Sequence, residues 1–226
     1  MNSKPFSIAI DGPAGAGKSS VARAVAAELN AMYLDTGAMY RAFGLYMLRK
    51  GATHNPEAIV AAVDDVDITV EFIDGAQHIF LGGEDVTQAI REPEVSMAAS
   101  TVSAVPQVRE RMVALQRRIA EGHSVIMDGR DIGTKVLPNA TLKIFLTASV
   151  EERARRRCLE LEKKGMPEPY EKVLLEMQER DYQDTHRAAS PLRPADDAVT
   201  VDTTAFGFDE VVARIKGLAI EAIGKA

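Results

Sequence analysis

The residues best suited to chemistry stand near the N-terminus, in the run Gly12-Pro13-Ala14-Gly15-Ala16-Gly17-Lys18-Ser19. Its spacing, G-x-x-x-x-G-K-S, follows an apolar run and precedes a helical pattern, which is the usual context of a phosphate-binding loop. Glycines allow backbone N–H groups to converge on phosphate oxygens, Lys18 adds a positive charge, and Ser19 can place its hydroxyl on a magnesium ion. The pattern predicts that this loop and the following Ser20 bind a nucleoside triphosphate.

A second group of candidates consists of arginines and acidic residues that come after predicted strands or share one predicted helical face. A guanidinium gives a phosphate two parallel charge-assisted hydrogen bonds, so several arginines suit a second phosphate held in line with the first. The alternative is that each arginine makes an ordinary surface ion pair with a neighbouring acidic residue. We predict that Lys18 acts together with Arg41, Arg130 and Arg180 to stabilise charge during phosphoryl transfer. The full set is Arg41, Arg130, Asp131, Arg180, Asp184 and Arg187. Its last three members, Arg180, Asp184 and Arg187, are spaced four and three residues apart, which predicts that they share one helical face.

An arginine-rich arm is predicted at 149–169. Ser149 begins a capping box, and Gly165 marks the end of the helix that it starts. One interpretation is a solvated helix with ordinary salt pairs, and the other is a lid that excludes water from the phosphates. We place Arg156 in the nucleotide site. The arginines of the arm are Arg153, Arg155, Arg156 and Arg157.

Composition excludes several classes of protein. The 226 residues carry a formal net charge of −6, which argues against a nucleic-acid polymer as partner. The single cysteine, Cys158, cannot form an internal disulfide, and the four histidines have no metal-ligand spacing. No apolar run has the length of a signal or membrane segment, so we expect a cytoplasmic protein without a membrane partner. We also expect a monomer, although no sequence feature determines the oligomeric state.

Short apolar runs alternate with helical patterns along the chain, which indicates crossover connections between parallel strands. We therefore predict an α/β fold with a five-stranded parallel sheet flanked by helices, in a single domain over 1–226. A stretch of alternating polarity around Asp74-Gly75 predicts an antiparallel hairpin within a small inserted lobe at 63–99. The predicted strands are 6–10, 32–34, 124–128, 142–147 and 198–202. The predicted helices are 18–29, 38–50, 108–121, 150–162 and 209–223.

Six blocks of sequence together resemble the bacterial cytidylate kinase family, and they extend over nearly the whole chain. Their order and spacing are far more specific than the phosphate-binding loop alone. The blocks are Asp11 to Lys18, Asp35-Thr36-Gly37-Ala38-Met39-Tyr40-Arg41, Gly83-Glu84-Asp85-Val86, Gly129-Arg130-Asp131-Ile132-Gly133-Thr134, Glu151-Glu152-Arg153-Ala154, and Arg180-Asp181 through Arg187 with Pro191-Leu192.

The resemblance implies a P-loop nucleoside monophosphate kinase core with a β-rich insert and a helical lid. It implies transfer of the γ-phosphate of ATP to CMP or dCMP. By the family pattern Thr36, Arg41, Arg130 and Arg180 bind the acceptor phosphate, Ser100, Arg109 and Asp131 face the cytosine, and Asp184 and Arg187 hold the sugar. Cytosine has an amine that can donate to Asp131 and Ser100 and two acceptors that suit Arg109. Uracil would instead place a carbonyl oxygen opposite the carboxylate of Asp131, so that two acceptors would face each other.

Two points stay open at this stage. The magnesium ion has one clear ligand in Ser19, while Asp128 and Asp11 are weaker candidates at strand ends. Two other functions also fit a phosphate-binding loop, namely a kinase for another small acceptor and a nucleotide-dependent binding switch. The switch predicts a guanine-reading N-K-x-D run, which the chain lacks.

Overall fold

A computed structural model describes residues 5–225. The first four residues, which the sequence analysis places before the first strand, lie outside this described range. The chain divides into two compact units, the first formed by Met1–Ala31 and Ser124–Ala226 and the second by Met32–His123. No helix of the described range has both the length and the apolar character that a membrane crossing requires.

The main sheet has five strands in the order β2-β6-β1-β7-β8, which confirms the predicted α/β fold. β1 pairs in parallel with β6 and β7, and β7 pairs in parallel with β8. Ile8, Ala9 and Ile10 of β1 are fully buried, as expected for a central strand covered on both faces. The strands are β1 (Ser7–Asp11), β2 (Met32–Asp35), β6 (Val125–Gly129), β7 (Leu142–Thr147) and β8 (Val199–Asp202).

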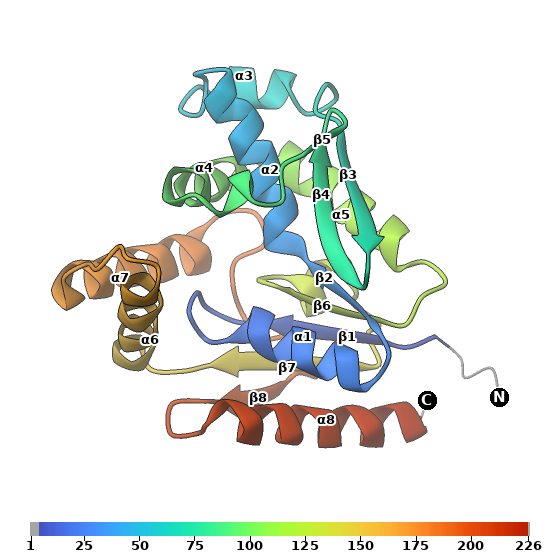
Figure 1. Ribbon diagram of the computed structural model, residues 1–226. Helices are drawn as coiled ribbons and strands as arrows, with labels where there is room; N and C mark the ends of the chain where they lie inside the picture. The colour runs from blue at the N-terminus through green and yellow to red at the C-terminus, as the bar shows by residue number, and fades with distance from the viewer. Residues whose placement is uncertain (1–4, 226) are drawn as a thin grey trace. The chain divides into compact units, whose positions relative to one another are not determined.

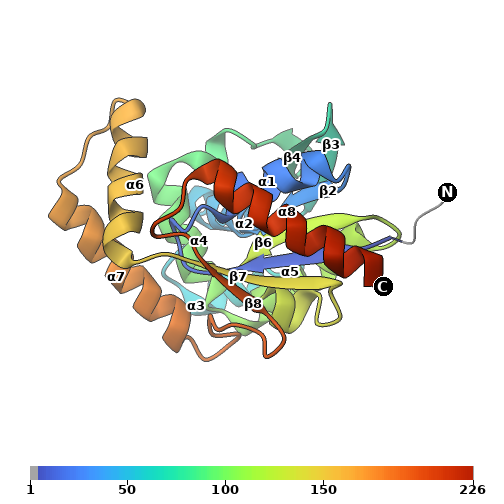
Figure 2. The same cartoon turned by 90° about the horizontal axis from the view of Figure 1, so that it is seen from below.

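Two helices of the first unit lie side by side, α1 (Lys18–Glu28) and α8 (Phe208–Lys225) (Figure 2). α1 packs on β6 and α8 packs on β7. Each buries an apolar stripe at helical spacing, seen in Val21 and Val25 of α1 and in Val211 and Ile215 of α8. Both helices were predicted from that spacing.

A helical hairpin follows β7 and consists of α6 (Val150–Lys163) and α7 (Tyr170–His186) (Figure 1). Ser149 caps α6 by accepting a hydrogen bond from the Glu152 backbone, which confirms the predicted start of the helix. The reciprocal bond of a capping box is absent, because the Ser149 N–H donates to the Thr204 hydroxyl and the Glu152 carboxylate pairs with Arg156. The hairpin has its own apolar core of Ala154, Leu161, Val173 and Met177.

The end of α7 bears on the predicted grouping of three residues. Arg180 and Asp184 lie on α7, and Arg187 follows its last residue with an extended ψ of 141°. The Arg187 N–H still donates to the Gln183 carbonyl at 3.1 Å and its Nη1 lies 3.6 Å from Asp184 Oδ1, so Arg187 keeps the predicted place beside Asp184. The chain turns back because the Leu192 backbone N–H donates to the carbonyl of Asp184, whose oxygen would otherwise accept the next helical bond.

The second unit contains the predicted antiparallel hairpin, β3 (Ile68–Ile73) with β4 (Ala76–Leu81), and the short β5 (Glu84–Asp85). Asp74 and Gly75 connect β3 to β4 with φ values of 51° and 76°, the backbone that a two-residue hairpin turn needs. The helices of this unit are α2 (Thr36–Arg49), α3 (Pro56–Ala61), η1 (Ala89–Arg91), α4 (Pro93–Ser103) and α5 (Pro106–Ala120).

The sequence patterns did not predict α4, which packs closely against α2. The contact is built on small residues, since a Cβ on Gly44 would lie 2.8 Å from the backbone nitrogen of Ala99. Small side chains produce little of the large apolar periodicity by which an amphipathic helix is detected.

Candidate functional site

The phosphate-binding loop connects β1 to α1 and depends on glycines at two places. Gly12 has a φ of 147°, and a Cβ there would overlap the carbonyl oxygen of Leu146 on β7. Gly17 has a φ of 88° and precedes the first residue of α1, with no side chain capping the helix. The N-terminus of α1 therefore presents its backbone N–H groups and its positive dipole end beside the loop, as anion binding requires.

The side chain of Lys18 folds back against the phosphate-binding loop. Its Nζ donates to the carbonyl of Pro13 at 2.7 Å, and the residue is only 5% exposed. The pKa of Lys18 is lowered to about 7, mainly by burial and next by the charge of Arg130, while Asp128 acts in the opposite direction. An anion in the loop would favour the charged form of Lys18.

Ser19 and Asp128 meet directly, since the Ser19 hydroxyl donates to Oδ2 of Asp128 at 2.8 Å. A hydroxyl beside a carboxylate supplies the oxygen donors that magnesium prefers, so these residues fit the predicted ion. Asp11 is engaged elsewhere, because its two carboxylate oxygens accept the backbone N–H groups of Ile132 and Gly133 at 2.8 and 2.7 Å. Among the described residues no group of three or more His, Cys, Asp or Glu side chains is placed to hold a metal.

Arg130 and Asp184 form a partly buried ion pair near the loop. Arg130 Nε donates to Asp184 Oδ2 at 2.8 Å, and Arg187 Nη1 lies 3.6 Å from Asp184 Oδ1. Burial opposes ionisation of Asp184, but Arg130, Arg180 and Arg187 together hold its pKa below the usual value. Arg180 also contributes to the low pKa of Lys18, so its charge acts on the same region.

Asp131 stands at the start of a single π-helical turn, η2 (Ile132–Val136), and is 4% exposed. π-Helical turns are rare and are frequently found at functional sites. The two amides that follow Asp131 are the ones bound by Asp11. The end of β1 thus fixes the backbone on which Asp131 stands.

Arg153 of α6 joins three parts of the first unit. Its Nε donates to the carbonyl of Ala148, and its Nη1 donates to the carbonyl of Ala14 in the phosphate-binding loop, both at 3.0 Å. Its two terminal nitrogens also donate hydrogen bonds to the Asp181 carboxylate of α7, at 3.1 and 2.5 Å. We call Arg153 and Asp181 the clamp, because they connect the loop to the helix that carries Arg180 and Asp184.

The other arginines of the arm divide between the two interpretations of the sequence. Arg155 and Arg157 make surface pairs with Glu152 at 3.8 Å and Glu160 at 2.8 Å, as the solvated-helix interpretation predicts. Arg153 and Arg156 instead reach beyond their own helix. The arm therefore contributes two arginines to the region of the loop.

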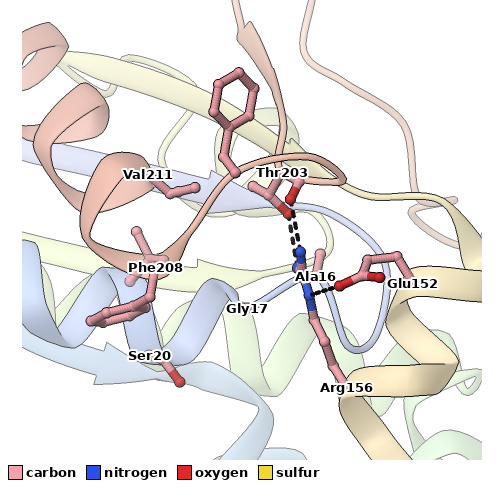
Figure 3. A pocket seen from close by; sticks show the side chains of 10 residues that line it. Ala16, Gly17, Ser20, Glu152, Arg156, Thr203, Phe208 and Val211 are labelled. Carbon is pink, nitrogen blue, oxygen red and sulfur yellow. Dashed lines mark hydrogen bonds and ion pairs between the residues drawn. The ribbon is translucent and has the colours of Figure 1, made fainter.

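A cavity of about 250 Å³ opens beside the phosphate-binding loop, and Arg156 forms one side of it (Figure 3). The guanidinium is held on both sides, by Glu152 at 3.0 Å and by the hydroxyl and carbonyl of Thr203 at 3.0 and 2.7 Å. The lining residues are Ala16, Gly17, Ser20, Val21, Glu152, Arg156, Thr203, Phe206, Phe208 and Val211.

The sequence analysis missed Thr203, Phe206 and Phe208 of this lining. A signal was present, since two aromatic residues flank Gly207 in the loop after the last strand. Both are about half exposed, at 47% and 52% for Phe206 and Phe208, which is unusual for phenylalanine.

The second unit holds Thr36 and Arg41 near the start of α2. Asp35 precedes the helix, caps it by accepting the Ala38 N–H at 3.0 Å, and pairs with Arg41 Nη2 at 2.7 Å. Gly37 leaves room for this pair, since a Cβ there would lie 3.3 Å from Nη1 of Arg41. Thr36 is buried, with 3% of its surface exposed.

Ser100 and Arg109 lie on α4 and α5 of the same unit. Arg109 is 4% exposed, donates to the carbonyl of Ser103 at 3.1 Å, and stands over the ring of Tyr40 at 5.3 Å. The hydroxyl of Ser100 donates weakly to the Ser96 carbonyl at 3.4 Å. Tyr40 is thus a neighbour of Arg109 that the sequence analysis did not assign.

The predicted site residues fall into two groups, one in each unit. In the first unit, Lys18, Ser19, Asp128, Arg130, Arg180, Asp184 and Arg187 lie around the phosphate-binding loop. In the second unit, Thr36, Arg41, Ser100 and Arg109 are positioned by α2, α4 and α5. A partly buried cluster of opposite charges beside a phosphate-binding loop can hold polyphosphate and stabilise its charge during transfer.

Comparison with known proteins identifies one family. The chain matches the family described as cytidylate kinase over residues 8–220. A cytidylate kinase from Caldicellulosiruptor bescii is 50% identical over 221 residues, covering 97% of this chain and 98% of that protein. One from Streptococcus sanguinis is 52% identical over 229 residues, covering 98% and 100%. One from Geobacillus thermodenitrificans is 51% identical over 218 residues, covering 96% and 97%.

Proposed function

The chain belongs to the cytidylate kinase family, and from this premise we propose which of its residues transfer the γ-phosphate of ATP to CMP or dCMP. The enzyme is an ATP-dependent nucleoside monophosphate kinase whose products are ADP and CDP or dCDP. The observation that best supports the assignment of residues is the cluster of charges near the phosphate-binding loop, where Arg130 and Arg187 lie 2.8 and 3.6 Å from the carboxylate of Asp184.

ATP occupies the first unit in this proposal. Its phosphates lie in the loop from Gly12 to Ser19 and at the N-terminus of α1. Its base enters the cavity beside Ser20, where the flat guanidinium of Arg156 and the two phenylalanines offer stacking surfaces. Hydrogen bonds to Thr203 and Glu152 keep the Arg156 plane fixed, so binding costs little side-chain ordering.

The transfer itself is a direct in-line displacement. An oxygen of the acceptor phosphate forms a bond to the γ-phosphorus of ATP, while the bond from that phosphorus to the β,γ-bridging oxygen breaks and ADP leaves. Lys18 exchanges the Pro13 carbonyl for phosphate oxygens and neutralises the charge that spreads over the transferred group. No covalent enzyme intermediate is needed.

The residues proposed for the acceptor are those of the family pattern. Arg41, Arg130 and Arg180 hold its phosphate together with Thr36, and Asp184 and Arg187 hold its sugar. Ser100, Arg109 and Asp131 recognise the cytosine, whose amine suits the carboxylate of Asp131. Support comes from burial, since Arg109 and Asp131 are each 4% exposed and a buried group discriminates strongly against an unmatched partner.

Magnesium fits beside the loop, held by Ser19 with Asp128, and when bound it would neutralise charge on the β- and γ-phosphates. We further propose that the enzyme acts as a cytoplasmic monomer. Its net charge of −6 agrees with a small-molecule substrate rather than a nucleic-acid polymer.

The function is tested by measuring ADP release with CMP, dCMP, UMP, AMP and GMP as acceptors. We expect CMP and dCMP to give the highest kcat/KM. Equal values for CMP and AMP would contradict the proposal and favour a kinase for another acceptor, and CMP binding without transfer would favour a binding switch.

Base recognition is tested separately with Asp131→Asn. The amide can donate to the uracil carbonyl where the carboxylate cannot, so the preference for CMP over UMP should fall roughly ten-fold or more. Arg155→Ala, at a surface pair, is the matched control. An unchanged ratio of kcat/KM for CMP and UMP would show that Asp131 does not face the base.

A further inference from the structure

A second arginine shares the carboxylate that holds Arg41. Oδ2 of Asp35 accepts a hydrogen bond from Arg41 Nη2 at 2.7 Å and from Arg91 Nη1 at 3.2 Å. The two guanidinium groups therefore lie next to each other at the start of α2, although Arg91 belongs to η1, fifty residues further along the chain.

The charges in this cluster do not cancel. Burial opposes ionisation of Asp35, but Arg41 and Arg91 hold its pKa below the usual value, so the carboxylate is charged at neutral pH. Two guanidinium groups against one carboxylate leave one net positive charge. The carboxylate that both arginines share belongs to the N-cap residue of α2, a helix end whose dipole also favours an anion.

The arginines have donors to spare. Among the described residues, Asp35 is the polar partner found for the Arg91 side chain, which is 47% exposed. Nε of Arg41 is buried without a hydrogen-bond partner in the described range. A guanidinium has five N–H groups, so an oxyanion can bind both arginines while Asp35 keeps its own bonds.

The cluster is held in place from several segments. Gln77 of β4 accepts from the Asp35 backbone N–H at 2.7 Å and donates to its carbonyl at 3.2 Å. Ile90, next to Arg91, is fully buried, and its N–H donates to the carbonyl of Val86. Arg91 is thus positioned by the fold of the second unit rather than by its ion pair alone.

We propose that Arg91 is a further ligand of the acceptor phosphate and binds it together with Arg41. The inference rests on the proposed function, in which Arg41 faces that phosphate. It gives the segment after the β3–β5 sheet a direct part in substrate binding. The competing explanation is that Arg91 only ties this segment to Asp35.

Calorimetric titration of the full chain with CMP and with cytidine separates the two explanations, because cytidine lacks the phosphate. We expect Arg91→Ala to weaken CMP binding roughly ten- to a hundred-fold, the range for hydrogen bonds to a charged group, while cytidine binding changes less than about two-fold. A structural tie would weaken both ligands by the same factor.

Arg91→Gln makes the test independent of folding defects. The amide can still donate to Asp35 but carries no charge, so a structural tie predicts near-normal CMP binding and a phosphate ligand predicts loss. Arg49→Ala is the matched control, since Arg49 makes an exposed pair with Glu84 in the same unit, at 2.6 and 2.8 Å, and should change neither ligand.

Two results lead to different conclusions. Arg91→Gln with an unchanged ratio of CMP to cytidine affinity would overturn the role of Arg91 and leave the function standing. A wild-type enzyme that binds cytidine as tightly as CMP would instead contradict the proposed function itself.

Discussion

Asp11 illustrates how a single side chain can serve structure at an energetic cost. It ends β1 and bridges to the amides of Ile132 and Gly133 while being only 4% exposed. The pKa of Asp11 is raised to about 6, mainly by burial and to a smaller extent by Asp131, whereas the two backbone bonds and Lys18 act in the opposite direction. Desolvation is thus only partly offset by the hydrogen bonds.

The pH dependence of stability follows from this shift. Because the folded pKa lies above the unfolded one, the contribution of Asp11 is greatest below pH 4 and is lost as pH rises through 6. Two pKa units correspond to about 3 kcal/mol. Urea unfolding between pH 4 and pH 7 should therefore show wild type losing about this much relative to Asp11→Asn, which does not titrate.

Asp197→Asn is the control for this measurement. Asp197 is an exposed carboxylate whose pKa is lowered by a hydrogen bond from Lys143. A lowered pKa contributes stability that is lost only as pH falls below the unfolded value, so its effect should be flat from pH 5 to pH 7. The same flat difference for Asp11→Asn would show that Asp11 is not desolvated.

At the scale of elements, the clamp determines how α6 and α7 attach to the rest of the first unit. The hairpin core is small, with four buried residues. Besides this core, Arg153 donates hydrogen bonds to the carbonyls of Ala14 and Ala148 and two hydrogen bonds to the carboxylate of Asp181. Its side chain is 5% exposed, so the pair lies largely beyond the screening that weakens surface pairs.

Breaking the clamp should therefore be costly. Asp181→Ala leaves a buried guanidinium without its carboxylate, and we expect a loss of about 3 kcal/mol in the free energy of unfolding, measured with urea. Arg155→Ala, two residues from the clamp on the same helix, should change stability by less than about 0.5 kcal/mol. Similar losses for the two variants would mean that the clamp contributes no more than a surface pair.

The elements that were predicted carry local signals. Ser149 caps α6, Asp74 and Gly75 turn the hairpin, and the glycine spacing marks the phosphate-binding loop, each within a few residues of sequence. The sheet follows from apolar runs alternating with helical patterns. Boundaries differ by one or two residues, as expected where helix ends fray.

What escaped prediction depends on contacts through space. Arg91 is a candidate ligand only because its side chain pairs with Asp35 in space. Tyr40 is a neighbour of the site only because Arg109 lies over its ring. No local pattern encodes such pairings, so these residues look like ordinary surface or core positions in the sequence.

The whole molecule is acidic, yet its site residues are mostly basic. The net charge of −6 coexists with a phosphate-binding region whose named cations are Lys18, Arg130 and Arg180. A local basic cluster is enough for a small polyphosphate, whereas a polymer needs a basic surface. Nucleotides that bind to this basic cluster should therefore add to the free energy of unfolding of the folded chain.

Thermal unfolding with each nucleotide should report the two ligands separately. A ligand at a hundred times its Kd adds about 2.7 kcal/mol to the free energy of unfolding. We expect ATP and CMP each to stabilise wild type, and Lys18→Ala to lose part of the ATP increment while keeping that of CMP. Equal loss of both increments would contradict the assignment of Lys18 to the donor.

The close approach of Gly12 to β7 has a consequence for how freely the phosphate-binding loop can vary. A side chain at Gly12 would overlap the Leu146 carbonyl, so neither selection nor a designed library can place another residue there without moving the sheet. Gly17 faces open space and requires only its left-handed φ of 88°, a backbone that asparagine also adopts. Two glycines of one motif are thus constrained for different reasons, one by the sheet beneath it and the other by its own backbone.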